Sequence, residues 1–145
     1  MDSTTNRAPQ SSPERSPGFA RNPDHDIAVV PFDGVVTVSF SSAIIAASKN
    51  AKVLRETNHP DRFYIPFEDI YFDFLHPSER WTHCPYKGDA NYWNVTAAGE
   101  SERDVMWADE HPYAEMLEIR NHGAFYPDKV RVEAVEQSDT ERPIS

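Results

Sequence analysis

The chain has 145 residues, of which 39% are hydrophobic, and its 14 basic and 24 acidic residues give a net charge of −10. This length fits one domain, and the acidic charge excludes a nucleic-acid groove and disfavours an anionic membrane surface, because both need clustered Lys and Arg. The single cysteine, Cys84, excludes an intrachain disulfide.

Polar segments flank the predicted domain. Residues 1–26 contain four prolines and almost no aliphatic side chains, so they cannot bury enough apolar surface to offset the entropy of ordering them. The sequence therefore predicts a flexible tail at 1–26, a compact β domain at 27–133 and a second flexible tail at 134–145. No apolar run approaches the ~18 residues of a membrane span, and no secretory h-region is present, so we expect a cytoplasmic protein without a membrane partner.

Alternating apolar and polar residues predict several short strands in the first half of the domain. These strands are expected at Val36–Phe40, Ala43–Ala47, Lys52–Glu56, Phe63–Pro66 and Ile70–Leu75, with a loop at His76–Glu79. An edge strand such as Val36–Phe40 could pair with a second copy, so a homodimer is possible on this pattern.

The second half of the domain follows the same pattern. Tyr86–Asp89 is a predicted turn, because Gly88 tolerates a positive φ. Further elements are expected as strands at Ala90–Thr96, Asp104–Trp107, Ala124–Tyr126 and Val130–Val132, and as one short helix at Tyr113–Arg120. Short strands joined by Gly, Pro, Asn and Asp turns predict a mostly β fold, either a small single-domain barrel or a folded antiparallel sheet with one short helix.

Four motifs together resemble one known family. They are Leu54-Arg55-Glu56, Phe63-Tyr64-Ile65-Pro66 with Asp69, Thr82-His83-Cys84-Pro85-Tyr86-Lys87-Gly88 with Tyr92-Trp93, and Ala124-Phe125-Tyr126-Pro127. Over about residues 30–132 they resemble the domain-of-unknown-function family numbered 427, which is also catalogued as nucleotidyltransferase-like. The resemblance implies a compact, tent-like β fold. No Gly-Ser pair precedes a spaced Asp-x-Asp in the chain, so the residues themselves do not indicate nucleotidyl transfer.

The longest of these motifs contains three candidate chemical groups. Lys87, in the predicted turn, could bind a phosphate or carboxylate, or act as a base if buried, and it could equally be a solvated turn residue. Cys84 could be a nucleophile with a base from elsewhere, such as His59 or His122, or a small packing residue. His83 points to the opposite face of a strand from Cys84.

Arg55 and Glu56 follow a strand-like pair, so one of them should point inward. A buried arginine there would be an anion clamp, or a structural ion pair with a carboxylate such as Asp69. Tyr64, Tyr86, Tyr92 and Trp93 supply aromatic surface typical of pocket walls. One cysteine and six scattered histidines do not form a recognisable zinc motif, so no metal or other cofactor is expected.

These residues predict a small-molecule enzyme that uses acid–base chemistry in a polar, aromatic pocket. The expected catalytic residues are Glu56, His83 and Lys87. The expected substrate-binding residues are Arg55, Tyr64, Cys84, Tyr86, Tyr92 and Trp93. An isomerase, cyclase or hydrolase acting on a biosynthetic intermediate fits this set; the alternatives are a non-catalytic small-molecule-binding module and an interaction or adaptor protein.

Overall fold

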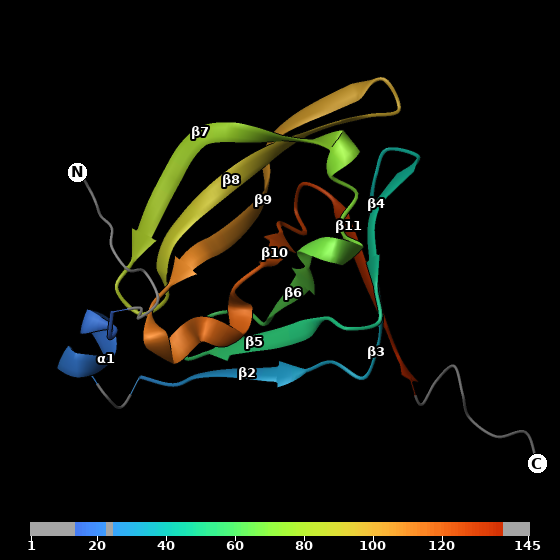
Figure 1. Ribbon diagram of the computed structural model, residues 1–145. Coiled ribbons are helices and arrows are strands. Elements are labelled where there is room, and N and C mark those ends of the chain that lie inside the picture. The colour runs from blue at the N-terminus through green and yellow to red at the C-terminus, as the bar shows by residue number, and fades with distance from the viewer. Residues whose placement is uncertain (1–13, 23–24, 138–145) are drawn as a thin grey trace, which may run out of the picture.

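A computed structural model describes residues 14–22 and 25–137 of the chain, and most of the two predicted tails lie outside these ranges. The described part contains two antiparallel sheets (Figure 1). The seven-stranded sheet has the order β2 (Ile27–Pro31), β5 (Lys52–Glu56), β6 (Arg62–Pro66), β10 (His122–Phe125), β9 (Glu100–Pro112), β8 (Gly88–Ala97) and β7 (Leu75–Cys84). The three-stranded sheet has the order β11 (Arg131–Glu136), β3 (Gly34–Phe40) and β4 (Ala43–Ser48).

The seven-stranded sheet is folded over but stays open. In Figure 1, β7, β8 and β9 run along the upper side of the molecule, β2 and β5 along the lower side, and β3, β4 and β11 stand at the right. Within the described residues, β2 and β7 each pair on one side only, so the sheet is not closed into a barrel. The prediction of a mostly β, single small domain is confirmed, in its folded-sheet form rather than its barrel form.

The two faces of the large sheet support two separate apolar cores, because neighbouring residues of a strand point to opposite faces. Ile65 and Trp93 join the core shared with the three-stranded sheet. Tyr64 and Tyr92, one position earlier in each strand, join the second core with Trp107. The adjacent predicted pocket residues Tyr92 and Trp93 therefore do not line one surface.

The strand expected at Ile70–Leu75 is wrong in its local structure. Two short 3₁₀ turns, η1 (Phe67–Asp69) and η2 (Phe72–Phe74), precede β7. Packing of the rings explains the alternating pattern instead, since Phe72 contacts both Phe67 and Trp93 edge-on. The predicted loop at His76–Glu79 is part of β7, which accommodates Pro77 because an edge strand need not donate on its outer side.

The helix expected at Tyr113–Arg120 is the 3₁₀ segment η3 (Ala114–Ile119), which kinks at Met116. Met116 and Ile119 are both buried, and a three-residue spacing places side chains on one face of a 3₁₀ helix. Asn121, with a positive φ of 63°, ends the segment.

The strand β3 lies in the middle of its sheet, between β11 and β4. Its use as a free edge for a second copy is therefore wrong, because its backbone groups already pair on both sides. The homodimer itself stays a prediction. Among the residues described, no helix is long and apolar enough to cross a membrane.

A short helix, α1 (Pro17–Arg21), lies within the segment that the sequence assigns to a tail. Ser16 caps it, since the Phe19 N–H donates to Ser16 Oγ at 3.3 Å. The Gly18 N–H donates to the Pro85 carbonyl at 2.7 Å, and a Cβ on Gly18 would lie only 2.7 Å from that oxygen. This glycine therefore allows α1 to pack against the turn that follows β7.

Candidate functional site

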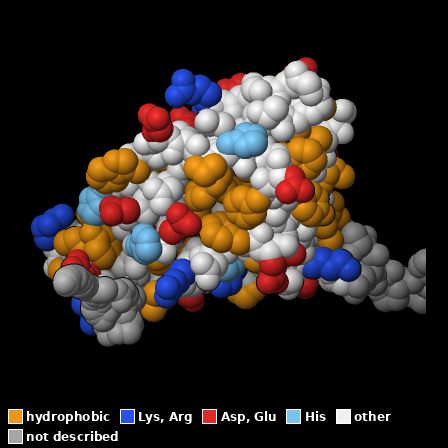
Figure 2. All heavy atoms as spheres, turned by 45° about the horizontal axis from the view of Figure 1, so that its top comes forward, with side chains coloured by type: hydrophobic (Ala, Val, Ile, Leu, Met, Phe, Trp, Pro, Cys, Tyr) orange, Lys and Arg blue, Asp and Glu red, His pale blue; other side chains and the backbone are white. Residues whose placement is uncertain are grey.

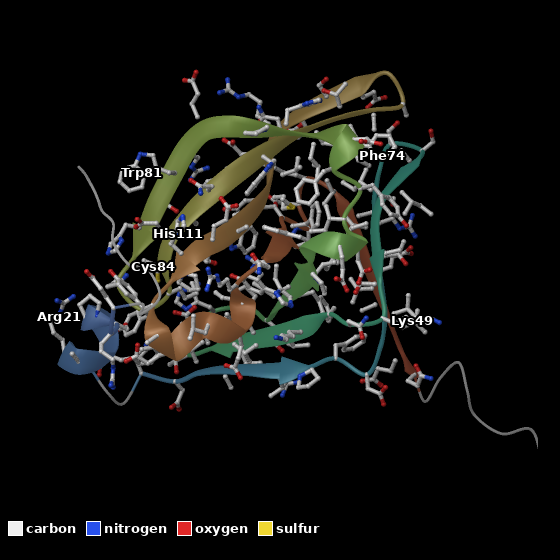
Figure 3. The ribbon with its side chains drawn as sticks, in the orientation of Figure 1. Arg21, Lys49, Phe74, Trp81, Cys84 and His111 are labelled. Carbon is white, nitrogen blue, oxygen red and sulfur yellow. The ribbon has the colours of Figure 1, made fainter. Side chains whose placement is uncertain are left out.

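A cavity of about 690 Å³ opens between η3 and the neighbouring ends of β7, β8 and β9. Its lining includes Trp81, His83, Asp89, His111, Tyr113 and Arg120. Figure 3 labels Trp81 and His111 on this side of the molecule, and Figure 2 shows histidine and acidic side chains among hydrophobic ones. This volume lies within the range of small-molecule sites.

His83 is held between two partners in this cavity. The antiparallel register sets His83 of β7 opposite Asp89 of β8, and His83 Nδ1 lies 2.7 Å from Asp89 Oδ1. A carboxylate only accepts hydrogen bonds, so Nδ1 carries a proton, and in the neutral imidazole Nε2 is then the acceptor. The Tyr113 hydroxyl lies 3.4 Å from that Nε2, with the two rings perpendicular.

The Tyr113 hydroxyl stays protonated at neutral pH. Burial, followed by the nearby charge of Asp89, raises the pKa of Tyr113 above its ordinary value. Tyr113 therefore acts as a hydrogen-bond donor to His83, and the three side chains form a carboxylate–imidazole–hydroxyl relay at the cavity wall. The lining also contains the exposed apolar side chain of Leu117 in η3 and the basic residue Arg120 at its end.

A second group of ionisable residues is buried at the ends of β5 and β8. Glu56 Oε1 lies 3.3 Å from Lys87 Nζ, and Glu56 Oε2 lies 3.0 Å from His25 Nε2. The exposed fractions of these side chains are 7% for Glu56, 19% for Lys87 and 14% for His25. Burial raises the pKa of Glu56, but the charge of Lys87 and the hydrogen bond with His25 outweigh it, so the pKa is lowered overall.

Asp109 of β9 extends this buried group. The Trp107 indole N–H donates to the Tyr64 hydroxyl at 3.0 Å, and that hydroxyl donates to Asp109 Oδ2 at 3.2 Å. Asp109 is 1% exposed. Burial raises the pKa of Asp109 to about 6, although Lys87 and the Tyr64 hydrogen bond oppose the rise. We call the set Glu56, Lys87, His25, Asp109 and Tyr64 the buried cluster.

The turn after β7 connects the buried cluster to the cavity. Lys87 points toward Glu56, and Asp89, two residues later, points toward His83. Gly88 between them has a φ of 117°, and a Cβ there would lie 2.7 Å from the His111 carbonyl oxygen. Only glycine fits this conformation and close approach, so Gly88 allows one turn to supply both groups.

The N-terminal segment covers the same turn. His25 stacks on the Tyr86 ring at a centroid distance of 4.0 Å, and Phe19 of α1 contacts Tyr86 edge-on at 5.2 Å. The Ser16 hydroxyl donates to the Pro85 carbonyl at 2.8 Å. Residues outside the predicted domain thus supply one member of the buried cluster and part of its cover.

The nine predicted site residues fall into several places. Glu56, Lys87 and Tyr64 meet in the buried cluster, and His83 lines the cavity without them. Arg55 points outward and pairs with the exposed Asp61 at 3.5 Å, because Glu56 takes the inward position.

The remaining predicted site residues lie outside both the cavity and the buried cluster. Tyr86 packs under His25, Trp93 belongs to the core shared by the two sheets, and Cys84 is half-buried and free. Tyr92 lies on the face of β8 opposite to Asp89, where its hydroxyl is 2.8 Å from Thr82 Oγ1.

Sequence reasoning missed His25, Asp109 and the partners of His83. One signal was present for Asp109, since it directly follows the apolar run Val105–Ala108 and lies two residues after Trp107, which places it on the same face of a strand as that ring. His25 follows a proline-rich segment and carries no comparable signal. Across residues 14–22 and 25–137, no group of three or more His, Cys, Asp or Glu residues is arranged to hold a metal ion.

Comparison with known proteins gives a family but no activity. The family model described as a domain of unknown function (DUF427) matches residues 28–136. A search of curated proteins finds no match. The matched range contains the cavity residues from β7 to η3 and all of the buried cluster except His25.

Proposed function

The chain belongs to the DUF427 family, and because that description assigns no reaction, we propose from its geometry that it is a small-molecule enzyme working by acid–base chemistry in the cavity beside η3. One observation carries the proposal: His83 lines a cavity of about 690 Å³ while Asp89 and Tyr113 hold its two ring nitrogens.

His83 is the proposed general base. Its Nε2 accepts a proton from the substrate, and Asp89 stabilises the imidazolium that forms, as a carboxylate does when it orients a catalytic imidazole. Tyr113, which donates to the same nitrogen in the free protein, transfers its hydrogen bond to an oxygen of the substrate. The protonated His83 then returns its proton at the product stage, so the cycle needs no cofactor.

The rest of the cavity indicates the kind of substrate. Trp81 and Leu117 supply exposed apolar surface, and Arg120 supplies a cation. A compound with an apolar part and an anionic or carbonyl group suits such a lining. An isomerisation, cyclisation or hydrolysis of a biosynthetic intermediate needs only this shaped site and one or two proton movers.

Glu56 and Lys87 take a different role in this proposal. They do not line the cavity, but their ion pair fixes the turn that carries Asp89. They are therefore positioning residues for the orientation of His83.

The test compares proton-transfer variants on a metabolite extract. Purified protein is incubated with the extract, and untargeted mass spectrometry follows which compounds disappear and which appear. We expect wild-type protein to convert at least one compound and His83→Gln to slow that conversion by about 10²-fold or more, the usual contribution of a general base. Asp89→Asn should slow it as well, through the lost orientation of His83.

His76→Gln is the matched control, because His76 is an exposed histidine of the same strand. Its variant should convert the compound at the wild-type rate. Full conversion by His83→Gln would refute the proposed base. Retention of a compound without any conversion would instead assign the cavity to a binding module.

A further inference from the structure

Three cations lie over aromatic rings on the face of the large sheet opposite to the cavity. The Arg80 guanidinium lies 4.5 Å from the Tyr92 ring centroid, and the Arg62 guanidinium lies 5.8 Å from the Trp107 ring. The Lys129 ammonium lies 5.7 Å from the Tyr126 ring. The rings themselves adjoin, since Tyr126 is 4.5 Å from Trp107 and 6.5 Å from Tyr92 by centroid.

The alternation of β7 explains why this face is separate from the cavity. Trp81 and His83 line the cavity, whereas Thr82 lies beside Tyr92. Residues two apart share a face of a strand, so Arg80 and Thr82 point to the aromatic side. The same strand thus supplies both sites from its two faces.

The positive charge on this face is incompletely neutralised. Arg62 makes no ion pair with any residue of the described ranges, and the one partner of Arg80 there, Asp104, is 3.8 Å away. Lys129 Nζ is engaged by the carbonyl of Arg103 at 2.9 Å. In a chain with 24 acidic and 14 basic residues, an arginine without a carboxylate partner is a site where negative charge can be accepted from outside.

Three hydroxyl groups belong to the same aromatic face, those of Thr82, Tyr92 and Tyr126. Thr82 Oγ1 is 2.8 Å from the Tyr92 hydroxyl, and the Tyr92 and Tyr126 rings lie nearly parallel with their centroids 6.5 Å apart. Thr82 and Tyr92 carry two hydroxyl protons, and one suffices for the bond between them. One O–H of this pair therefore remains to donate to an external acceptor.

The Tyr126 hydroxyl stays protonated, so it does not repel an anion. Burial, followed by the neighbouring Tyr92 hydroxyl, raises the pKa of Tyr126 to about 12. The charges of Arg80 and Arg62 both oppose this rise.

We propose that Arg62, Arg80 and the hydroxyls of Thr82, Tyr92 and Tyr126 bind the phosphate group of a small molecule. Two guanidinium groups match the double negative charge of a phosphate, and each can form paired N–H···O bonds with its oxygens. The free O–H of the Thr82–Tyr92 pair supplies a further donor. This site is separate from the cavity of His83 and is independent of the reaction proposed there.

The test is a titration followed by ¹H–¹⁵N NMR at constant ionic strength, with inorganic phosphate as one probe and phenyl phosphate as the other. We expect saturable shifts of the arginine side-chain Nε–H signals of Arg62 and Arg80. Tighter binding of phenyl phosphate would identify an organic phosphate as the ligand, and equal binding would identify the phosphate group alone.

Variants locate the site. Arg62→Gln and Arg80→Gln should each weaken phosphate binding by about tenfold, the effect of one charge-assisted hydrogen bond. Tyr126→Phe, which removes only a hydroxyl from the half-buried ring, should weaken it less. Arg131→Gln is the control, because Arg131 is an exposed arginine of the other sheet paired with Glu133.

Two results would overturn the proposal. One is the absence of saturable shifts with both probes in a protein whose spectrum shows that it is folded. The other is binding that survives Arg62→Gln and Arg80→Gln but disappears in His83→Gln or Arg120→Gln, because the phosphate would then occupy the cavity. Unchanged phosphate binding by His83→Gln is the expected outcome, whether or not His83 is a catalytic base.

Discussion

The relay in the cavity and the buried cluster contain the same kinds of side chain but differ in their exposure to water. His83 and Asp89 pair at 2.7 Å with about half of each side chain exposed, whereas Glu56 contacts both Lys87 and His25 with 7% of its side chain exposed. They lie at the two ends of one short turn. The comparison teaches that a carboxylate paired with a base can serve either proton transfer or the stability of the fold. The degree of burial of the pair decides between the two roles.

The physical reason lies in the cost of removing charge from water. A buried charge whose partner is removed keeps its desolvation cost, so breaking such a pair destabilises the fold strongly. An exposed pair contributes up to about 1 kcal/mol because water and salt replace the lost partner. The buried cluster should therefore dominate stability, while the relay should dominate any activity.

The largest expected effect is that of Glu56→Gln. The substitution keeps the shape of the side chain but leaves the ammonium of Lys87 without its negative partner, so we expect the free energy of unfolding to fall by about 3 kcal/mol. Urea denaturation measures it. Arg55→Gln is the control on the same strand, and since the ion pair of Arg55 is exposed, its loss should cost under about 1 kcal/mol. Equal losses of unfolding free energy in the two variants would show that burial of the ion pair does not determine its contribution to stability.

The next effect concerns pH and Asp109. Its pKa is raised in the folded state from 3.8 to about 6, so the folded protein holds this proton more tightly than the unfolded chain does. The contribution of Asp109 to stability is therefore fully present below pH 3.8 and is lost as the pH rises through about 6. The loss amounts to about 3 kcal/mol.

Asp109→Asn isolates that contribution, because an amide accepts the Tyr64 hydrogen bond but does not titrate in this range. The stability of the wild type relative to the variant should fall between pH 4 and pH 6, as followed by urea denaturation at each pH. The lowered pKa of Glu56 acts in the opposite sense, since its contribution is present above its unfolded pKa and is lost as the pH falls. Comparison with the variant cancels that opposing contribution. A difference independent of pH would show that Asp109 is not titrating as a buried acid.

The two regions also differ in how much of them the sequence predicts. Glu56 and Tyr64 could be expected together, because they belong to neighbouring predicted strands, but alternation requires only that one of Arg55 and Glu56 point inward and does not say which. His25 could not be expected, since its place depends on α1 packing against Pro85 and Tyr86 across a large sequence separation. The sequence predicted only part of the relay. His83 was expected as a proton mover, but Asp89 and Tyr113 required the register of β7 on β8 and the position of η3.

The fold shows the same division. Alternation identified β3, which has one apolar face against a core, whereas β8 has apolar side chains on both faces, such as Tyr92 and Trp93. It was wrong at Ile70–Leu75, because Phe72 satisfies the same pattern through contacts with Phe67 and Trp93 in a 3₁₀ turn. Apolar periodicity reports which side chains are buried, and it does not distinguish a strand from a turn whose rings pack together.

The smallest effect tests the connection between the regions. Asp89→Asn removes the partner of His83, and because that pair is half exposed, stability should change by under about 1 kcal/mol. The charge of Asp89 also contributes to the raised pKa of Asp109, so the same variant should move the Asp109 transition to lower pH. The ¹³C chemical shift of the Asp109 carboxyl measures this transition directly, and Asp61→Asn, at an exposed acid paired with Arg55, is the control.

A shifted Asp109 transition in Asp89→Asn alone would mean that the charge at the cavity wall affects the pKa of the buried cluster across the turn at Gly88. An unshifted transition would make the two regions electrostatically independent, and the relay would then be tuned only by the residues that line the cavity.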